Sequence, residues 1–339
     1  NVENTSGSDI RLAPFSSLKR HGEPQDLTGF FIIQEGPIRQ SGEEMNEFSY
    51  GNMEDFDTDE RWGANAEVLE VEQNGWLGFT DHYWMTTLVP AAERPFTSVL
   101  KYNAIADVYS AEARGKTITV DAGATGSVTT HLFAGAKEWE TIRDYQDDGT
   151  IYKYVDSIDW GWFSFLTKPI FSVLRWLNGM IGNMGWSIIA LTLAIKALLF
   201  PLAYKSYVSM AKMKELQPEM AKLKEKAGDD RQKLQKEMMQ LYKKEKVNPA
   251  SGCLPILLQI PIFFSLYKVI FVTIELRHAP WFGWLKDLSQ PDPSSILNLF
   301  GLLPYATPDA GSIFAIVSLG ILPILLGISM WLQQKLNPA

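Results

Sequence analysis

Three long apolar stretches occupy the second half of the chain and are separated by polar segments. They cover residues 186–204, 254–274 and 313–332. Each is close to the roughly 20 residues that a helix needs to cross a bilayer. Pro261 and Pro323 fall inside these stretches, and proline is tolerated there when neighbouring helices satisfy the freed backbone groups. The pattern predicts three transmembrane helices.

The first half of the chain has the pattern of β-strands. Short stretches rich in aromatic, β-branched and other apolar residues follow one another, for example in residues 75–90 and 98–111, and Gly-containing turns separate them. Strands at a spacing of roughly ten residues are typical of an antiparallel sandwich. We therefore predict a β-sandwich domain over residues 1–160.

Residues 163–182 repeat apolar side chains at helical spacing, which predicts an amphipathic helix that lies in a membrane interface. The residues expected on the apolar face are Leu166, Ile170, Phe171, Leu174, Leu177 and Ile181. Those expected away from it are Lys168, Ser172, Arg175 and Asn178. A helix packed on the sandwich is the alternative interpretation.

The apolar residues at helical spacing and the many basic residues of segment 205–252 predict a helical hairpin that is apolar inside and basic outside. Gly228 can end the first helix, and Asp229 or Asp230 can cap the second. The apolar stripe of the first helix comprises Met210, Met213, Leu216, Met220 and Leu223. The stripe of the second comprises Leu234, Met238 and Leu241.

The net charge of −8 over 339 residues hides a sharp division along the chain. Residues 1–160 contain 12 Lys and Arg against 28 Asp and Glu, a balance of −16, whereas residues 205–246 contain 12 against 7, a balance of +5. Basic segments next to membrane spans stay in the cytoplasm. The charge division therefore predicts a cytoplasmic hairpin, with residues 1–160 and 275–312 on the outer side.

Lys196 interrupts the apolar run of residues 190–202. A lysine at the centre of a membrane helix is unfavourable by about 3 kcal/mol on insertion-based scales. Tyr204, eight residues later, lies roughly 12 Å away along a helix, farther than a lysine stem reaches. The three spans contain no Asp or Glu that could pair with it, so we predict that Lys196 faces water. Lys268, near the outer end of the second span, is expected to extend to the surface.

Other chemistry has weaker support in the sequence. An ion or proton transporter could use Lys196 as a gating charge, but such proteins carry acidic partners within their spans. Ser209 and Lys212 have the spacing of acyl-enzyme hydrolases without the accompanying motifs. The calcium-loop-like acids Asp55, Asp57 and Asp59 lack the following glycine. We expect no enzyme activity, no metal and no cofactor. The single cysteine, Cys253, excludes an intramolecular disulfide.

Long runs of the chain resemble the YidC/Oxa family of membrane protein insertases, in its Gram-negative branch with a large periplasmic domain. Two of these runs are SIIALTLAIKALLFPLAYKSYVSMAKMKELQPEM (187–220) and EKVNPASGCLPILLQIPIFFSLY (245–267). Two others are GWFSFLTKPIFSVLRWLNGMIGNMGWS (161–187) and NGWLGFTDHYWMTTLVP (74–90). The resemblance covers roughly residues 70–339.

The resemblance implies an α+β membrane protein of the inner membrane that crosses it several times. A periplasmic antiparallel β-sandwich would precede an α-helical transmembrane bundle with a cytoplasmic helical hairpin. Family members insert membrane proteins alone or with the Sec translocon and help them fold. The expected partners are therefore nascent membrane proteins, the Sec translocon, the ribosome and membrane lipids, with no small-molecule substrate.

The resemblance also implies a hydrophilic groove open to the cytoplasm and to lipid. Its cation would be Lys196, where arginine is usual in this branch, and lysine lacks the planar fork of arginine. Thr192, on the same helical face, and Gln259 are the other expected groove residues. Lys222, Lys226 and Lys233 would belong to the partner-binding exterior of the hairpin. Members carry an anchor span before this region and two more spans after it, so we expect the sequence to be part of a longer chain.

Overall fold

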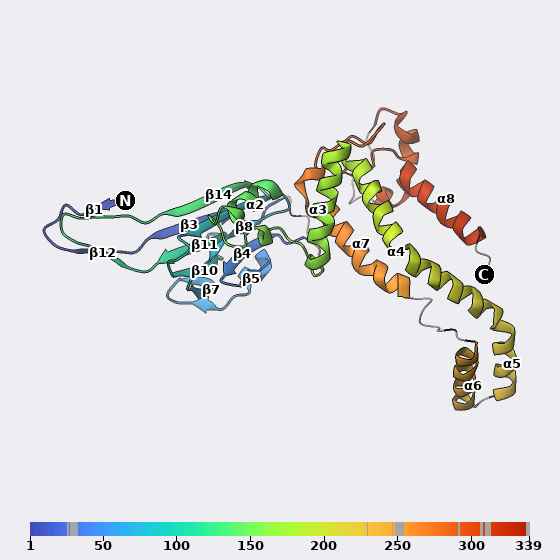
Figure 1. The fold of residues 1–339 in the computed structure, drawn as a ribbon. Coiled ribbons are helices and arrows are strands. Elements are labelled where there is room, and N and C mark those ends of the chain that lie inside the picture. Colours follow the sequence, from blue (N-terminus) through green and yellow to red (C-terminus); the bar gives the residue numbers. More distant parts are fainter. Residues whose placement is uncertain are drawn as a thin grey trace. The chain divides into compact units, whose positions relative to one another are not determined.

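The structure, a computed structural model, divides into a strand-rich unit and a helical unit (Figure 1). The first comprises Asn1–Trp162 with Ile270–Glu275, and the second Phe163–Val269 with Leu276–Ala339. Cys253 lies outside the described residues. The structure describes residues 1–25, 27, 33–228, 230–245, 247, 254–290, 292–305, 308 and 313–336.

Two five-stranded antiparallel sheets form the first unit, which confirms the β-rich domain predicted from the sequence. The first sheet has the order β3 (Phe15–His21), β11 (Val108–Gly115), β10 (Phe96–Asn103), β7 (Ala64–Val71) and β6 (Thr58–Asp59). The second has the order β14 (Thr130–Ala136), β9 (Trp84–Pro90), β8 (Trp76–Thr80), β4 (Gly36–Ser41) and β5 (Glu44–Glu47).

Shorter elements complete this unit. Two small antiparallel pairs are β1 (Val2–Glu3) with β13 (Thr125–Gly126), and β2 (Ile10–Leu12) with β12 (Ile118–Val120). The helices are α1 (Tyr50–Glu54), α2 (Trp139–Asp147) and the 3₁₀ turn η1 (Tyr154–Ser157).

Both large sheets contribute to one core, so the domain is a sandwich. Leu100 and Tyr109 come from the first sheet, and Leu77 and Leu88 come from the second. Side chains alternate between the two faces along each strand, and the central strands β4 and β8 are buried on both faces. Tyr50 of α1 packs edge-on against Tyr109, with ring centroids 5.0 Å apart, and closes one end of this core.

Helices form the second unit. α3 packs on α4, and α5 packs on α6 (Figure 1). The helices are α3 (Ser164–Ile181), α4 (Met184–Glu215), α5 (Gln217–Ala227), α6 (Arg231–Lys244), α7 (Leu254–Val272) and α8 (Ile321–Leu336). Short 3₁₀ turns are η3 (Ile274–Leu276), η4 (Ile296–Gly301) and η5 (Ile313–Val317).

Helix α3 has two apolar sides rather than one. Phe171 and Leu174 of the predicted apolar face are buried. The polar residues predicted opposite this face occupy only part of the remaining surface. A second row of large apolar side chains is exposed, at positions that repeat with helical spacing. This row comprises Phe165, Val173, Trp176 and Met180.

Two helix boundaries differ from the sequence-based expectation. α4 does not end at residue 205, the predicted start of the hairpin, but continues to Glu215. The first helix of the hairpin, predicted to be continuous up to Gly228, is divided at Leu216 into the end of α4 and α5. Pro218 is the physical reason, because proline is accommodated in the first turn of a new helix but breaks the interior of an existing one. Gly228 ends α5, and the Asp230 carboxylate caps α6 by accepting a hydrogen bond from the Lys233 backbone N–H at 3.0 Å.

The third predicted span also begins later than expected. Residues 313–317 form a 3₁₀ turn, and the α-helix starts at Ile321. The preceding loop determines this start, since Ser294 Oγ accepts a hydrogen bond from the Ile321 N–H at 3.1 Å. Pro323 then lies in the first turn, where its missing N–H has no intrahelical partner to lose.

Within the described residues, one helix is long and apolar enough to cross a membrane, and this is α4. Its length of 32 residues exceeds the roughly 20 that a span requires. Two shorter apolar helices cover Leu257–Val272 and Ile321–Leu336. The structure therefore gives one clear candidate span where the sequence predicts three.

A segment from the loop after η3 holds the beginning of α4. The side-chain oxygen Oδ1 of Asn183 caps the helix by accepting from the Trp186 N–H at 3.1 Å, and the side-chain Nδ2 donates to the Trp281 carbonyl at 3.1 Å. The Trp186 ring packs on the Trp281 ring with centroids 5.5 Å apart. Gly185 allows this contact, because a Cβ there would lie 2.3 Å from Cγ of Trp281.

We expect Gly185→Ala to destabilise the helical unit by about 1–3 kcal/mol, because the added methyl group overlaps the Trp281 ring in a packed site. Gly179→Ala on α3 is the matched control. No atom lies within 4 Å of a Cβ placed there, so this change should be neutral or stabilising by up to about 1 kcal/mol. Thermal unfolding in detergent measures both, and equal midpoints for the two variants would contradict the packing argument.

Candidate functional site in a cavity lined by α4, α7 and α8

Three helices of the second unit line one cavity of about 540 Å³. Most of its wall is apolar, and polar side chains enter it from all three helices. α4 contributes Lys196 and Tyr207, α7 contributes Gln259, and α8 contributes Gln333. The main apolar wall residues are Leu199, Leu202, Met210, Leu258, Ile260, Phe263 and Phe264.

Lys196 is exposed, and it has no acidic partner in the part of the chain that the structure describes. Its ammonium therefore has no internal charge to compensate its transfer from water. Pro201, one turn farther along α4, cannot donate a backbone hydrogen bond. The Ala197 carbonyl beside Lys196 thus loses its usual intrahelical donor. Both groups favour water at this part of α4.

Gln259 and Gln333 supply amides to the same cavity. An amide can donate and accept hydrogen bonds at once, so it can pair with peptide groups or with either charge sign. No Asp or Glu is among the described lining residues. The cavity therefore combines one cation with neutral hydrogen-bonding groups, an arrangement that attracts negative charge without fixing one particular ligand.

The structure brings two of the three predicted groove residues together. Lys196 and Gln259 line the same cavity, but Thr192 is not among its lining residues. The Thr192 hydroxyl instead donates to the Ile188 carbonyl, one turn back on α4, at 2.8 Å. The hydroxyl hydrogen of Thr192 is therefore already used in a hydrogen bond within the helix. Thr192 also lies one turn before the first lining residue of the cavity, Lys196.

Sequence reasoning missed Gln333 and Tyr207. The run Gln333, Gln334, Lys335 at the end of an apolar stretch is visible in the sequence. It reads there as the polar end of a membrane span. Only the three-dimensional structure shows that Gln333 lines the same cavity as Lys196.

The outer surfaces of these helices are apolar. None of the described side chains of α8 is buried, although the helix carries Leu325, Leu326, Ile328 and Trp331. On α7, Leu257 is 59% exposed and does not line the cavity. Contiguous apolar surface of this extent marks contact with lipid or with another protein. A cavity containing a cation thus lies among helices whose outer faces suit hydrocarbon.

Lys268 departs from the expectation that it reaches the surface. It is buried, with 8% of its surface exposed, beside the buried Ser265 on α7. It interacts with other groups within the protein. A lysine held inside the unit needs such interactions because an isolated buried ammonium is strongly unfavourable.

The three hairpin lysines are exposed. Lys222 and Lys226 lie on α5, and Lys233 lies on α6. Between the helices, the Tyr242 hydroxyl donates to Met220 Sδ at 3.7 Å, and Leu241 is buried. The hairpin therefore has apolar contacts inside and cations outside, in line with the sequence pattern.

The remaining candidate sites are not assembled. Asp55 follows α1, and Asp59 belongs to β6, where its carboxylate accepts from the Arg61 N–H at 2.9 Å. Within the described residues no three His, Cys, Asp or Glu side chains gather as metal ligands. Ser209 and Lys212 both lie on α4, and no hydrogen bond joins them there.

Comparison with known proteins gives matches along the whole chain. Residues 1–173 match the family model described as YidC periplasmic domain, and residues 176–339 match that of the 60Kd inner membrane protein. A protein of Dinoroseobacter shibae named membrane protein insertase YidC is 67% identical over 338 residues, which is 100% of this chain and 56% of the relative.

Two further relatives carry the same name. The protein of a Jannaschia species is 62% identical over 355 residues, and that of Ruegeria pomeroyi is 63% identical over 343 residues. The matches cover 100% of this chain and 57% and 56% of these two relatives. The chain thus spans about half the length of the curated relatives it matches.

Proposed function

Because this chain belongs to the YidC family of membrane protein insertases, we propose that it inserts membrane proteins into the bilayer and helps them fold. The observation that carries the proposal is the cavity in which Lys196, Gln259 and Gln333 meet among helices with apolar outer faces. It joins a hydrophilic interior to a surface suited to lipid. Such a combination assists a polypeptide that has both polar and apolar segments.

The mechanism follows from the cost of moving polar groups through hydrocarbon. A charged residue at the centre of a bilayer is unfavourable by about 2.5–3.5 kcal/mol on insertion scales. A hydrated cavity reduces this barrier, and the Lys196 ammonium attracts acidic residues of the incoming segment. The substrate's own apolar helix then leaves along the apolar faces of α4, α7 and α8. Burial of its apolar surface, at about 25 cal/mol per Å², makes that step favourable.

The proposed placement in the inner membrane follows the charge division. The sandwich of residues 1–160 and the segment 275–312 would lie in the periplasm, and the hairpin of residues 205–252 in the cytoplasm. α4 would form the first span over residues 186–204. α7 and α8 would provide the other two, over residues 254–274 and 313–332.

Helix α3 would lie in the membrane interface over residues 163–182. Its exposed row, which includes Trp176 and Met180, supports this position because apolar side chains can enter the acyl boundary. Trp176 is also of the type that favours the interface. Lys168 and Arg175 lie on other sides of the helix and could remain near headgroups.

The hairpin would bind the ribosome or the Sec translocon through its exposed lysines. Lys222, Lys226 and Lys233 lack acidic partners among the described residues, so their charges are accessible to a negatively charged surface. Nascent membrane proteins and membrane lipids complete the proposed set of partners. No small-molecule substrate is required by this mechanism.

Lys196→Ala should reduce insertion of a substrate with an acidic translocated segment by roughly two- to fivefold, the range expected for an accessible charge pair. Lys196→Arg should retain activity because it keeps the charge. Lys205→Ala is the matched control, since Lys205 lies on the same helix outside the cavity lining.

The measurement is protease protection of the substrate in vesicles that contain each full-length variant. One single-span substrate is prepared in two forms, with either Asp or Asn in its translocated segment. The difference between the two forms measures the effect of the substrate's negative charge. The alanine variant should insert the Asn form normally. Full insertion of the Asp form by Lys196→Ala would contradict a role of the charge in insertion.

Cysteine labelling tests the topology. In a Cys253→Ser background, a membrane-impermeant maleimide applied to spheroplasts should label Ile105→Cys, whose site is fully exposed between β10 and β11. Gln232→Cys, exposed on α6, should be labelled only after the membrane is permeabilised. Labelling in the opposite order would reverse the proposed orientation.

Charge reversal at Lys222, Lys226 and Lys233 to Glu should weaken co-sedimentation with ribosomes. The effect should be larger at about 0.01 M salt, where charges act over about 30 Å, than at about 1 M salt, where they act over about 3 Å. Replacement of the same three residues by Arg is the control and should preserve binding. Unchanged sedimentation of the Glu variant at every salt concentration would remove the partner-binding role.

A further inference from the structure

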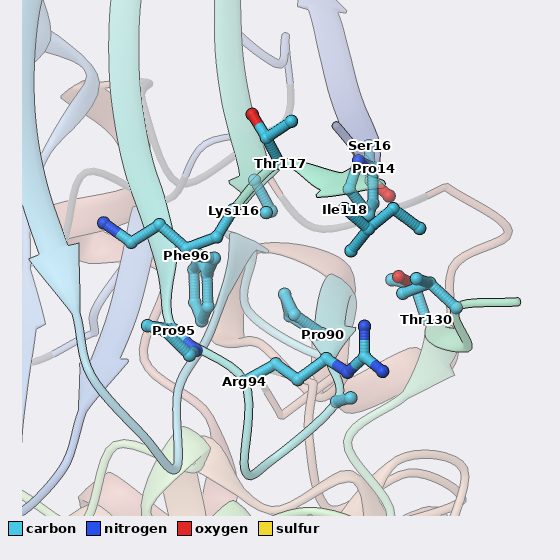
Figure 2. A pocket seen from close by; sticks show the side chains of 14 residues that line it. Pro14, Ser16, Pro90, Arg94, Pro95, Phe96, Lys116, Thr117, Ile118 and Thr130 are labelled. Carbon is cyan, nitrogen blue, oxygen red and sulfur yellow. The ribbon is translucent and has the colours of Figure 1, made fainter. Parts of the chain in front are cut away.

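A second cavity, of about 230 Å³, lies in the strand-rich unit. It is formed where β3 and β14 begin, where the β9–β10 turn passes, and where β11 ends (Figure 2). The wall is mainly apolar and includes three prolines with fixed backbone geometry. Its apolar residues include Pro14, Pro90, Pro95, Phe96 and Ile118.

Two cations belong to this cleft, but only Arg94 is available to a ligand. The Lys116 ammonium pairs with Glu70 at 2.7 Å, and Figure 2 shows its side chain extended away from the guanidinium of Arg94. Arg94 is exposed and has no acidic partner among the described residues. An unpaired arginine fork beside an apolar cleft suits a carboxylate, which can accept two parallel hydrogen bonds.

The cleft also meets two free strand edges. β3 pairs only with β11, and β14 pairs only with β9, so each forms the edge of its five-stranded sheet as described. Ser16 on β3 and Thr130 on β14 line the cleft. An edge strand presents unpaired backbone N–H and C=O groups, which can bind an added extended segment.

Large apolar side chains continue along these edges. Phe15 of β3 is 57% exposed, and Leu132 of β14 is 61% exposed. In an added strand, alternate side chains point to opposite faces. The side chains on one face of the added strand would therefore contact the cleft, Phe15 and Leu132. The backbone of the added strand would pair with the edge of β3 or β14.

We propose that this cleft binds an extended polypeptide segment, which places an apolar side chain between the prolines and a carboxylate against Arg94. The proposal does not depend on the insertase function. The cavity is smaller than the roughly 300–1,000 Å³ of typical small-molecule sites, so it suits an anchoring side chain rather than a whole cofactor. Phe96 is 2% exposed and offers no open aromatic face to a sugar ring.

Peptide binding to the full chain in detergent tests the proposal by fluorescence anisotropy. The probe is a labelled nine-residue peptide with alternating Val and Thr and one central Glu, compared with the same peptide carrying Gln. The Glu peptide should bind roughly two- to fivefold more tightly, as expected for one accessible ion pair. A third peptide, N-methylated at alternate backbone positions, should bind more weakly if the backbone adds to a strand edge.

Arg94→Gln should remove the preference for Glu over Gln, and Arg94→Lys should restore part of it. Arg61→Gln is the matched control, because Arg61 is also an exposed arginine of this domain but does not line the cleft. It should keep the full preference. As a fold control, circular dichroism of Arg94→Gln should match the wild type.

Four outcomes would overturn the proposal. Equal binding of the Glu and Gln peptides by the wild type would remove the role of Arg94, and so would an unchanged preference in Arg94→Gln. Absence of saturable binding by all peptides would exclude a polypeptide ligand. Binding to anionic vesicles that disappears in Arg94→Gln, without peptide binding, would assign the cleft to a lipid headgroup instead.

Discussion

The ammonium of Lys196 in an apolar helix is the constraint on which the helical unit depends. A charge in hydrocarbon requires water or a partner, and the described lining of its cavity contains no carboxylate. The packing of α4, α7 and α8 provides a cavity with two amides instead. Pro201 adds to the polarity of α4 by leaving the Ala197 carbonyl without its usual donor. The cavity thus places the cation beside neutral hydrogen-bonding groups, while the outer faces of the helices carry exposed apolar side chains.

The geometry around this charge also depends on how α4 is held at its beginning. Asn183, Gly185 and Trp186 contact the segment at Trp281, which comes almost 100 residues later. The close approach at Gly185 leaves little freedom for the helix to slide or rotate. These contacts fix the start of α4, and Lys196 lies three turns farther along the same helix.

The strand-rich unit follows different physical rules. Its core is apolar, and its sheets satisfy their own backbone groups except at the edges. Among the described residues, Arg94 has no acidic partner, and β3 and β14 each end a sheet, so this part of the domain can form further contacts. A peptide site there would allow the domain to bind a partner without any change in the sandwich.

The pattern along the chain predicts the β-rich first half, the helical second half and the hairpin, for which it leaves Asp229 and Asp230 as alternative caps, and it predicts that Lys196 faces water. These follow from local periodicity, turn residues and charge, which act over a few residues. The tertiary structure decided the start of α8 at Ile321, the burial of Lys268, the absence of Thr192 from the cavity lining and the presence of Gln333. Each of these depends on contacts between segments distant in sequence, and side-chain spacing along one helix does not specify which neighbour it will meet.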